Sequence, residues 1–510
     1  MKDRTAPPVF LRTQEPRATQ TPARGISPLP PQEHGTAIDR RRFLAASAAL
    51  AASAATPAYA APQLPTKRPP VSDRRFASPA VERELARVAS RIGDPKLRWM
   101  FGNCYPNTLD TTVRLTTRDG KPDAFVITGD IPCLWLRDSS AQVKPYLHLA
   151  KAAPELRMLF RGLIARQAAC ILIDPYANAF MEDPAATSNL EWSQRDETEM
   201  KPGVAERKWE IDSLCYPMRL AHGYWRATGD AAPFDPTWAA AARLSIRTFR
   251  EQQRKDGPGP YSFRRSAPQP TETLLWGHGA PTRPIGLIHS GFRPSDDACL
   301  YPFLIPSNLF AVTALHELAT VAQEAGNDPA LAQDAVDLAR EVEAALKQHG
   351  TMRLRDGREV WAYEVDGFGN TLFMDDANVP SLSGLAYLGC VAPDDPLWQR
   401  TQAAAWSETN PYFFKGKAGE GIGGPHVGPG QIWPMSLTIR ALSSSDDATI
   451  RDCLKTLRDT DGNTGFIHES FDQDDSAKFT RAWFAWANGL FGELILHLAR
   501  TRPALLKAAL

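Results

Sequence analysis

The sequence predicts an all-α protein in which six helical hairpins close into a ring, the (α/α)6 barrel, with long loops and small β insertions. Apolar residues recur with the period of a helix in about twelve segments. Long connections rich in Gly, Pro, Asp and Trp join them, and no fixed sequence period indicates a repeat solenoid. In such a barrel the loops at one end form a cup, where a functional site is expected.

The expected helices are segments whose apolar residues fall three or four positions apart. They are 81–92, 139–152, 154–173, 210–227, 236–254, 306–325, 328–348, 381–390, 397–408, 432–443, 447–459 and 479–500. In the segment 210–227, one helix face collects Ile211, Leu214, Cys215, Met218, His222 and Trp225. Short alternating segments predict small strands at 111–117, 124–128 and 359–365. Most of the unusual residues fall in five loops, 128–138, 289–308, 364–380, 421–434 and 462–475.

The N-terminal 60 residues differ from the rest of the chain. Residues 1–38 are polar and rich in Pro, and residues 39–44 (DRRRFL) precede a weakly hydrophobic Ala/Ser run. The run closes with Ala58, Tyr59 and Ala60, an A-x-A cleavage pattern. We expect residues 1–60 to be a leader and twin-arginine signal, read by the twin-arginine export machinery, and the protein to be periplasmic or secreted. An uncleaved anchor is the alternative, but a run this rich in Ala and Ser, broken by Pro57, would span a bilayer poorly. A linker, 61–75, and a single domain, 76–510, follow.

Composition favours a neutral substrate. Lys+Arg and Asp+Glu both total 58, so the chain lacks the basic field that nucleic acid or an acidic membrane surface requires. No further apolar run has transmembrane length, so no stable membrane insertion is expected. The seven cysteines show no metal-binding spacing, and Thr320 stands where an HExxH motif beginning at His316 needs its second His. We therefore expect no metal and no cofactor.

The loop at 128–139 carries the first candidate site residues. Trp135, Arg137 and Asp138 crowd a Gly/Pro turn before a helix. A sugar site needs an aromatic face for the C–H side of the ring and fixed charged groups for its hydroxyls. Helix capping is the alternative for Asp138 or Ser139, but it leaves Trp135 and Arg137 unexplained.

Two acids are candidates for proton transfer. Asp212 lies in the first turn of a helix whose next residues are apolar, so burial would raise its pKa and suit it to donate a proton. The alternative is an acid that complements the helix dipole. Glu469 follows His468 in a loop flanked by Phe466 and Phe471, where a carboxylate could activate water. A solvated loop acid is the alternative there, and the flanking aromatics make it the weaker one.

Three further loops have the composition of sugar subsites. They are 291–297, 373–378 and 426–433, which cluster Asp, Arg, Asn, His, Gln and Trp. Adjacent Asp pairs in two of them also suit calcium or plain turns.

Six strings, 128–138, 209–216, 292–308, 374–380, 426–433 and 465–471, together resemble glycoside hydrolase family 125. They lie in order over about 95–495. The resemblance implies an (α/α)6 barrel and a metal-independent exo-α-mannosidase that cleaves α-1,6-linked mannose with inversion. It implies Asp212 as general acid and Glu469 as general base. An inverting pair stands roughly 6.5–9.5 Å apart.

The resemblance also implies which residues bind the terminal mannose of a glycan substrate. Its hydroxyls would be held by Arg137, Asp138, His289, Asp375, Asn378, His426 and Gln431, and Trp433 or Trp135 would lie against its ring. Cys133 and Leu134 depart from the family's pattern, but as apolar fillers they leave the carboxylates unaffected. Two alternatives remain: a related (α/α)6 hydrolase of α-glucosides, and a non-catalytic glycan-binding protein, against which the presence of both carboxylates argues.

Overall fold

The computed structural model describes residues 64–267 and 269–508. Every described residue belongs to one compact unit, Thr56–Leu510. The expected leader and signal, residues 1–60, lie outside the described residues. The described part of the expected linker lies against the first helices, because Arg68 Nε donates to Asp110 (2.7 Å) and Arg68 Nη1 donates to Glu82 (2.9 Å).

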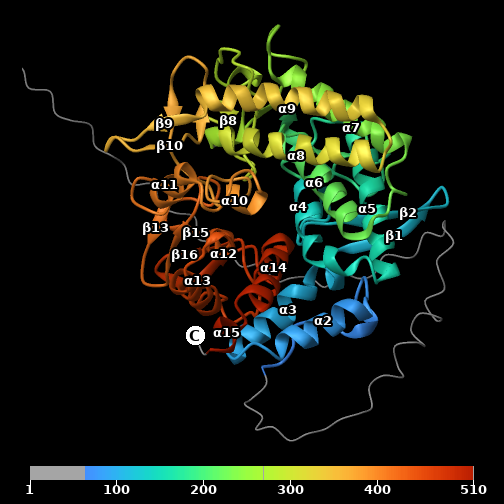
Figure 1. The fold of residues 1–510 in the computed structure, drawn as a ribbon, viewed down its shortest axis with the longest axis vertical. Helices are drawn as coiled ribbons and strands as arrows, with labels where there is room; N and C mark the ends of the chain where they lie inside the picture. Colours follow the sequence, from blue (N-terminus) through green and yellow to red (C-terminus); the bar gives the residue numbers. More distant parts are fainter. Residues whose placement is uncertain (1–63, 268, 509–510) are drawn as a thin grey trace, which may run out of the picture. The chain divides into compact units, whose positions relative to one another are not determined.

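Among the described residues, six helices form an inner ring (Figure 1). They are α4 (Leu136–Ala141), α6 (Ile211–Thr228), α8 (Ile305–Glu324), α10 (Leu385–Leu388), α12 (Pro434–Ser443) and α14 (Ala485–Thr501). Each contacts the next along the chain, and α14 contacts α4, so the ring closes. The partner helices lie outside: α3 (Pro95–Thr111), α5 (Pro154–Ile173), α7 (Pro236–Gln252), α9 (Pro329–His349), α11 (Pro396–Ala405) and α13 (Asp447–Asp459). This is the predicted (α/α)6 barrel, with α2 (Pro79–Ala89) and α15 (Pro503–Lys507) added outside it.

Four of the six outer helices start at a sequence signal. Asp-Pro pairs open α3, α7, α9 and α11, and the aspartates Asp94, Asp235, Asp328 and Asp395 each accept a backbone N–H from the first turn. The inner helices have no side-chain cap among the described residues. Their first turns open towards the loops that form the mouth of the barrel.

Small sheets join these loops. The three-stranded ones combine β3 (Leu134–Trp135), β4 (Ala179–Phe180) and β6 (Val204–Glu206); β8 (Phe303–Leu304), β11 (Glu364–Val365) and β12 (Thr371–Leu372); and β15 (Gln431–Ile432), β16 (Ser470–Asp472) and β17 (Asp475–Thr480). The two-stranded ones pair β1 (Val113–Arg118) with β2 (Lys121–Val126), β5 (Asp196–Glu197) with β7 (Arg264–Arg265), β9 (Thr351–Arg353) with β10 (Glu359–Trp361), and β13 (Phe413–Lys415) with β14 (Glu420–Ile422). The core lies between the helix layers, and none of the described helices is long and apolar enough to cross a membrane.

One expected helix is divided in the structure, and one observed helix was not expected. The segment 139–152 contains the end of α4 and a separate 3-10 helix, Lys144–Leu149. Pro145 lacks the N–H that a continuous helix would use there. The helix α3 has no counterpart among the expected segments, because its buried face includes Asn103, Asn107 and Asp110 beside apolar residues, which hides the helical period.

Candidate active site

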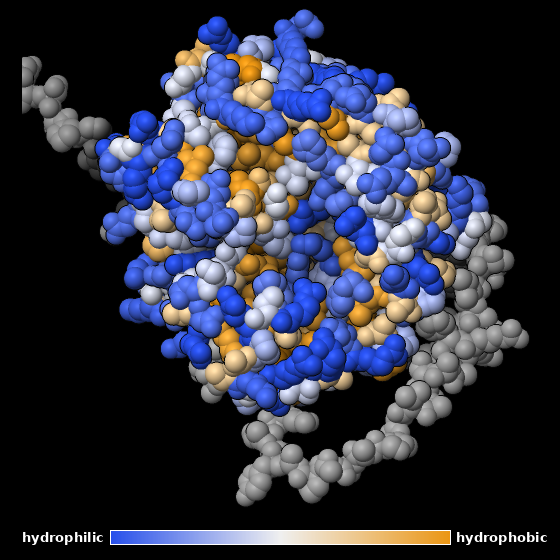
Figure 2. All heavy atoms as spheres, in the orientation of Figure 1, coloured by the Kyte–Doolittle hydropathy of each residue, from blue (hydrophilic) through white to orange (hydrophobic). Residues whose placement is uncertain are grey.

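A pocket opens among the loops that precede the inner helices. It encloses about 390 Å³ of space, counting its open mouth. Its walls are Thr128, Ile131, Trp135, Arg137, Asp138, Pro294, Ser295, Asp296, Asn378, His426, Trp433, Glu469, Arg481, Phe484 and Trp486. These residues come from the segments before and at the starts of α4, α8, α10, α12 and α14. The face of the molecule in Figure 2 is mostly polar at its periphery, with apolar surface nearer the centre.

Glu469 is held at the pocket by two donors. Its Oε2 accepts from the Thr480 hydroxyl (2.9 Å), and its Oε1 lies 3.3 Å from Nη1 of Arg481. Arg481 also binds Asp130 through Nη2 (2.6 Å). Each carboxylate oxygen of Glu469 is therefore held by one donor. The Glu469 side chain is 7% exposed and lines the pocket.

Arg137 gathers four carboxyl groups around one guanidinium. Its Nη1 donates to Glu210 (2.5 Å) and to Asp212 (3.2 Å). Its Nε lies 3.6 Å from Asp138, and its Nη2 lies 3.9 Å from Asp296. Two of these acids, Asp138 and Asp296, line the pocket with Arg137 itself. A single guanidinium group therefore contacts four acidic side chains at the mouth of the barrel.

Asp212 does not line the pocket. Its side chain is fully buried, and it lies behind Arg137. Burial raises its pKa to about 6, although Arg137 opposes the shift. The predicted rise in pKa is therefore present, but the Asp212 side chain is not part of the pocket lining.

Asp296 has the most exposed side chain of the four acids around Arg137. It lines the pocket with a side chain that is 27% exposed, and it accepts from Asn178 Nδ2 (3.3 Å). Lys208 Nζ donates to its main-chain oxygen (2.8 Å). Its φ of +69° lies in the left-handed region, which is unusual for a residue other than glycine. Sequence reasoning included Asp296 only as one member of the loop 291–297.

Of the residues expected to bind substrate, six line the pocket, and Glu469 lies with them. The six are Trp135, Arg137, Asp138, Asn378, His426 and Trp433.

Three other expected substrate ligands lie outside this lining. Asp375 is fully buried and accepts from the backbone N–H groups of Leu382 (2.8 Å) and Ser383 (2.9 Å), and burial raises its pKa to about 7. The ring of His289 is buried beside Phe303 at 6.3 Å, and burial lowers its pKa. Gln431 accepts from the Ser470 hydroxyl (3.3 Å), next to the pairing of β15 with β16. In this structure Asp375 and Gln431 hold loops in place through these hydrogen bonds.

Three residues of an aromatic and basic wall beside Trp433, namely Arg481, Phe484 and Trp486, were not predicted from the sequence. Phe484 lies 6.1 Å from the ring of Trp433 and 6.1 Å from that of Trp486, and Arg481 lies 4.6 Å above Phe484. All four residues line the pocket. The signal was present in the string 483–486 (WFAW), but it fell inside the expected helix 479–500, whereas α14 begins only at Ala485.

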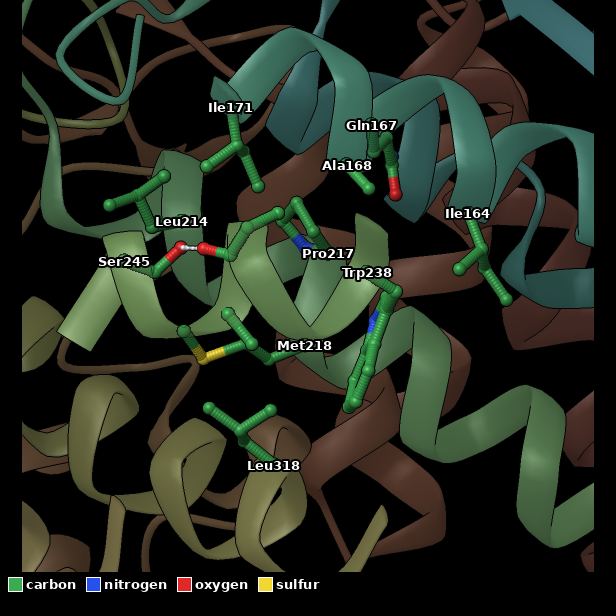
Figure 3. A pocket seen from close by; sticks show the side chains of 12 residues that line it. Ile164, Gln167, Ala168, Ile171, Leu214, Pro217, Met218, Trp238, Ser245 and Leu318 are labelled. Atoms are coloured by element: carbon green, nitrogen blue, oxygen red, sulfur yellow. Dashed lines mark hydrogen bonds between the residues drawn. The ribbon is translucent and has the colours of Figure 1, made fainter. Parts of the chain in front are cut away.

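A second hollow, between α5, α6, α7 and α8, lacks the groups to bind a sugar. Its lining is mostly apolar and includes Ile164, Leu214 and Leu318 (Figure 3). The Ser245 hydroxyl at its edge donates to the backbone of Ala241 (3.0 Å). This hollow is a packing gap between the two helix layers.

Among the described residues, no group of three or more His, Cys, Asp or Glu is arranged to hold a metal ion. The adjacent Asp375 and Asp376, which had suggested calcium, are occupied by internal donors. Asp376 accepts from Ser295 (2.6 Å) and from the backbone N–H of Asn378 (3.1 Å).

Comparison with known proteins identifies the family. Residues 94–496 match the model for the metal-independent alpha-mannosidases, glycoside hydrolase family 125. The chain is 42% identical over 469 residues to the meiotically up-regulated gene 157 protein of Schizosaccharomyces pombe, covering 88% of this chain and 92% of that protein. A metal-independent alpha-mannosidase structure from Streptococcus pneumoniae, in a non-productive complex with alpha-1,6-mannobiose, matches with a TM-score of 0.79 and 38% identity, covering 84% of this chain and 100% of that one. The chain therefore belongs to glycoside hydrolase family 125, the metal-independent α-mannosidases.

Proposed function

We propose that this glycoside hydrolase removes terminal α-1,6-linked mannose from a glycan with inversion of anomeric configuration. The observation that carries the proposal is one pocket lined by Glu469, from the segment before α14, and by Asp296, from the segment before α8. The S. pneumoniae relative was captured with alpha-1,6-mannobiose, which supports this linkage. Inversion needs a base that activates water and an acid that protonates the leaving oxygen on the other face of the sugar.

Glu469 is the proposed base. It accepts a proton from water while the water oxygen attacks the anomeric carbon. Arg481 and Thr480 hold the carboxylate in place for that step. The hydroxyls of the terminal mannose would be held by Asp138, Asn378 and His426, with Trp433 or Trp135 against the ring.

For the acid we propose Asp296 in place of Asp212. A general acid must come within hydrogen-bond reach of the glycosidic oxygen. Asp296 faces the pocket, whereas Asp212 is fully buried behind Arg137. On this proposal Asp212 holds Arg137, and Arg137 holds the acids and the sugar.

The experiment uses purified enzyme with α-1,6-mannobiose and follows the first-formed anomer by NMR. We expect β-mannose first, retained activity in EDTA, and little activity on the matched α-glucoside. Glu469→Gln should lower kcat at least about 100-fold. Retention of configuration, or a Glu469→Gln variant as active as wild type, would contradict the proposed mechanism.

Two substrates with different leaving groups distinguish between the two candidate acids. An activated 2,4-dinitrophenyl α-mannoside needs no protonation of its leaving group. Asp296→Asn should therefore lose most of its activity on mannobiose, by about 100-fold or more, and keep most of it on the activated substrate. Asp212→Asn should affect both substrates by similar factors. The reverse pattern would make Asp212 the acid.

We also propose that residues 1–60 direct export of the folded enzyme through the twin-arginine machinery. The arginine string and the A-x-A pattern support this, as do the cysteines: all seven lie in the described part of the chain, and none forms a disulfide. Free thiols suit a protein that folds in a reducing cytoplasm before export. Replacing Arg40 and Arg41 by Lys should keep the enzyme in the cytoplasm, as followed by cell fractionation. Unchanged export of this variant would refute the proposal.

A further inference from the structure

A further cavity, here called the Glu317 cavity, lies inside the ring at the end opposite the active site. Its walls come from the middle and later turns of α6 and α8, from Tyr387 in α10, and from the segment between Ser140 and Leu147. The active-site pocket is built instead from the starts of the inner helices and the loops before them. The Glu317 cavity encloses about 590 Å³, counting its open mouth, against about 390 Å³ for the active-site pocket. It therefore has at least as much room as the space proposed for the terminal mannose.

Two aromatic rings lie between the two spaces. Tyr216 lines the Glu317 cavity and Trp486 lines the active-site pocket, and their ring centroids are 6.2 Å apart. The Tyr216 hydroxyl donates to the main-chain oxygen of Val379 (2.9 Å), which fixes the tyrosine ring. Neither Glu469 nor Asp296 lines the Glu317 cavity. A molecule bound there is therefore distinct from the reacting sugar.

The charges around the Glu317 cavity balance one another. Lys144 Nζ pairs with Glu493 of α14 at 2.7 Å, and Arg219 Nη1 lies 3.7 Å from Glu317 Oε1. The same oxygen lies 3.5 Å from Nδ1 of His222. An ion would bring a charge without a counter-charge into this partly buried space, which is costly. The cavity therefore favours a neutral ligand.

Glu317 and Lys144 keep hydrogen-bonding capacity that the described residues do not use. Glu317 Oε1 has only the two long contacts just given, and its Oε2 meets no donor among the described residues. An ammonium group has three N–H donors, and Lys144 gives one of them to Glu493. A hydroxyl group both donates and accepts, so hydroxyls can serve the carboxylate and the ammonium alike.

The rest of the wall is apolar and leaves room. Ala141, Leu147 and Leu220 line the same cavity. Gly223, inside α6, costs roughly 1 kcal/mol relative to alanine in a helix. No backbone of another element requires glycine there, because outside α6 only Leu147 Cδ1, at 3.1 Å, lies within 4 Å of an added Cβ. The glycine therefore keeps the edge of the cavity open.

We propose that the Glu317 cavity binds one neutral, polyhydroxylated molecule of the size of a single sugar ring. Its hydroxyls donate to Glu317 and accept from Lys144, and its C–H groups pack against the leucine side chains. The site is separate from the catalytic one, so the proposal stands or falls independently of the reaction.

The probe is D-mannose, and its binding to the purified enzyme is measured by titration calorimetry. The background is His426→Ala, which removes a proposed sugar ligand of the active-site pocket. In this background Glu317→Gln keeps the size of the side chain but loses its charge, so the Kd should rise about tenfold or more. Glu324→Gln, at an exposed position of the same helix, is the matched control and should leave the Kd within about twofold.

Gly223→Leu tests the same cavity without altering a polar group. Its side chain occupies the space beside Leu147, so mannose binding in the His426→Ala background should be abolished, and circular dichroism checks that the variant folds. A crystal of the wild type soaked with mannose should show a sugar between Glu317 and Lys144. Glu317→Gln alone should keep wild-type kcat on α-1,6-mannobiose, because Glu317 does not line the active-site pocket.

Two results would overturn the proposal. One is a soaked crystal with mannose in the active-site pocket alone, and the other is a Kd that neither Glu317→Gln nor Gly223→Leu changes. Either would make the cavity a solvent-filled gap. A wild-type enzyme that hydrolyses no mannoside, yet holds mannose between Glu317 and Lys144, would contradict the proposed function and support this site.

Discussion

Two charged residues of the pocket have backbone conformations that are uncommon outside glycine. Asp296 has a φ of +69° and Arg481 a φ of +37°. Such conformations cost on the order of 1–3 kcal/mol each and persist where the surroundings hold them. Lys208 holds the main-chain oxygen of Asp296, and Asp130 with Glu469 holds the Arg481 side chain. Both side chains line the pocket.

Asp375 gives a prediction about pH and stability. Its pKa, raised to about 7 by burial, exceeds that of an unfolded aspartate, about 3.9. The folded state therefore binds more protons between these values, so this group's contribution is fully present below about pH 4 and is lost as pH rises through 7. We expect wild type to lose stability relative to Asp375→Asn, by up to about 1.4 kcal/mol per pH unit, between pH 5 and 7. Urea unfolding of both proteins at these two pH values measures it, and parallel pH dependences would contradict it.

The residues of the site were only partly predictable. Clusters of Asp, Arg, Asn and Trp at Gly/Pro turns correctly marked the loops at the mouth of the barrel. They do not reveal which way a side chain points. Asp375 and Asn378 stand in one string, yet only Asn378 reaches the pocket. The proposed role of Asp296 depends on a positive φ and a distant arginine, and neither leaves a local signal in the sequence.

At the scale of elements, the two helix layers begin differently. Asp-Pro starts fix four outer helices by local chemistry alone. The first N–H of an inner helix is bound by the loop of the next hairpin: Leu136 by Asn178 O (3.1 Å) and Ile305 by Tyr363 O (2.9 Å). The pairs β3–β4, β8–β11 and β15–β16 repeat this pattern. Long-range pairing of this kind explains why the sequence predicted strands in only three segments, 111–117, 124–128 and 359–365, and missed the short strands at the mouth of the barrel.

The outer caps can be tested without touching the site. Asp395 accepts the N–H of Trp398 (2.8 Å) at the start of α11. Replacing it by Ala should lower the free energy of unfolding by about 1 kcal/mol and leave kcat unchanged. The neighbouring exposed Asp394→Ala is the control, expected to stay within about 0.5 kcal/mol of wild type. Equal denaturation midpoints for the two variants would show that the cap contributes nothing.

At the scale of the whole domain, one seam closes the ring. The segment before α4 meets the start of α14 through Ala485 N to Thr128 O (3.1 Å) and a backbone bridge between Gly129 and Phe484. Arg137 and Asp138 lie just beyond one side of the seam, and Arg481 lies on the other. A loosened seam therefore moves the two halves of the pocket relative to each other.

At this seam, Gly129 is the residue most affected by an added side chain. Its φ is +136°, a region essentially restricted to glycine, and an added Cβ would stand 2.6 Å from the Trp483 carbonyl oxygen. Gly129→Ala should destabilise the enzyme by on the order of 1–3 kcal/mol and lower kcat/KM for mannobiose about tenfold or more, because small misplacements of catalytic groups are costly. Gly120→Ala is the matched control: its φ is +75° at the β1–β2 turn, and nothing lies within 4 Å of an added Cβ. It should cost about 1–2 kcal/mol in stability without changing kcat/KM. If both variants keep full kcat/KM, the seam does not position the pocket, and the two halves are held by the helices alone.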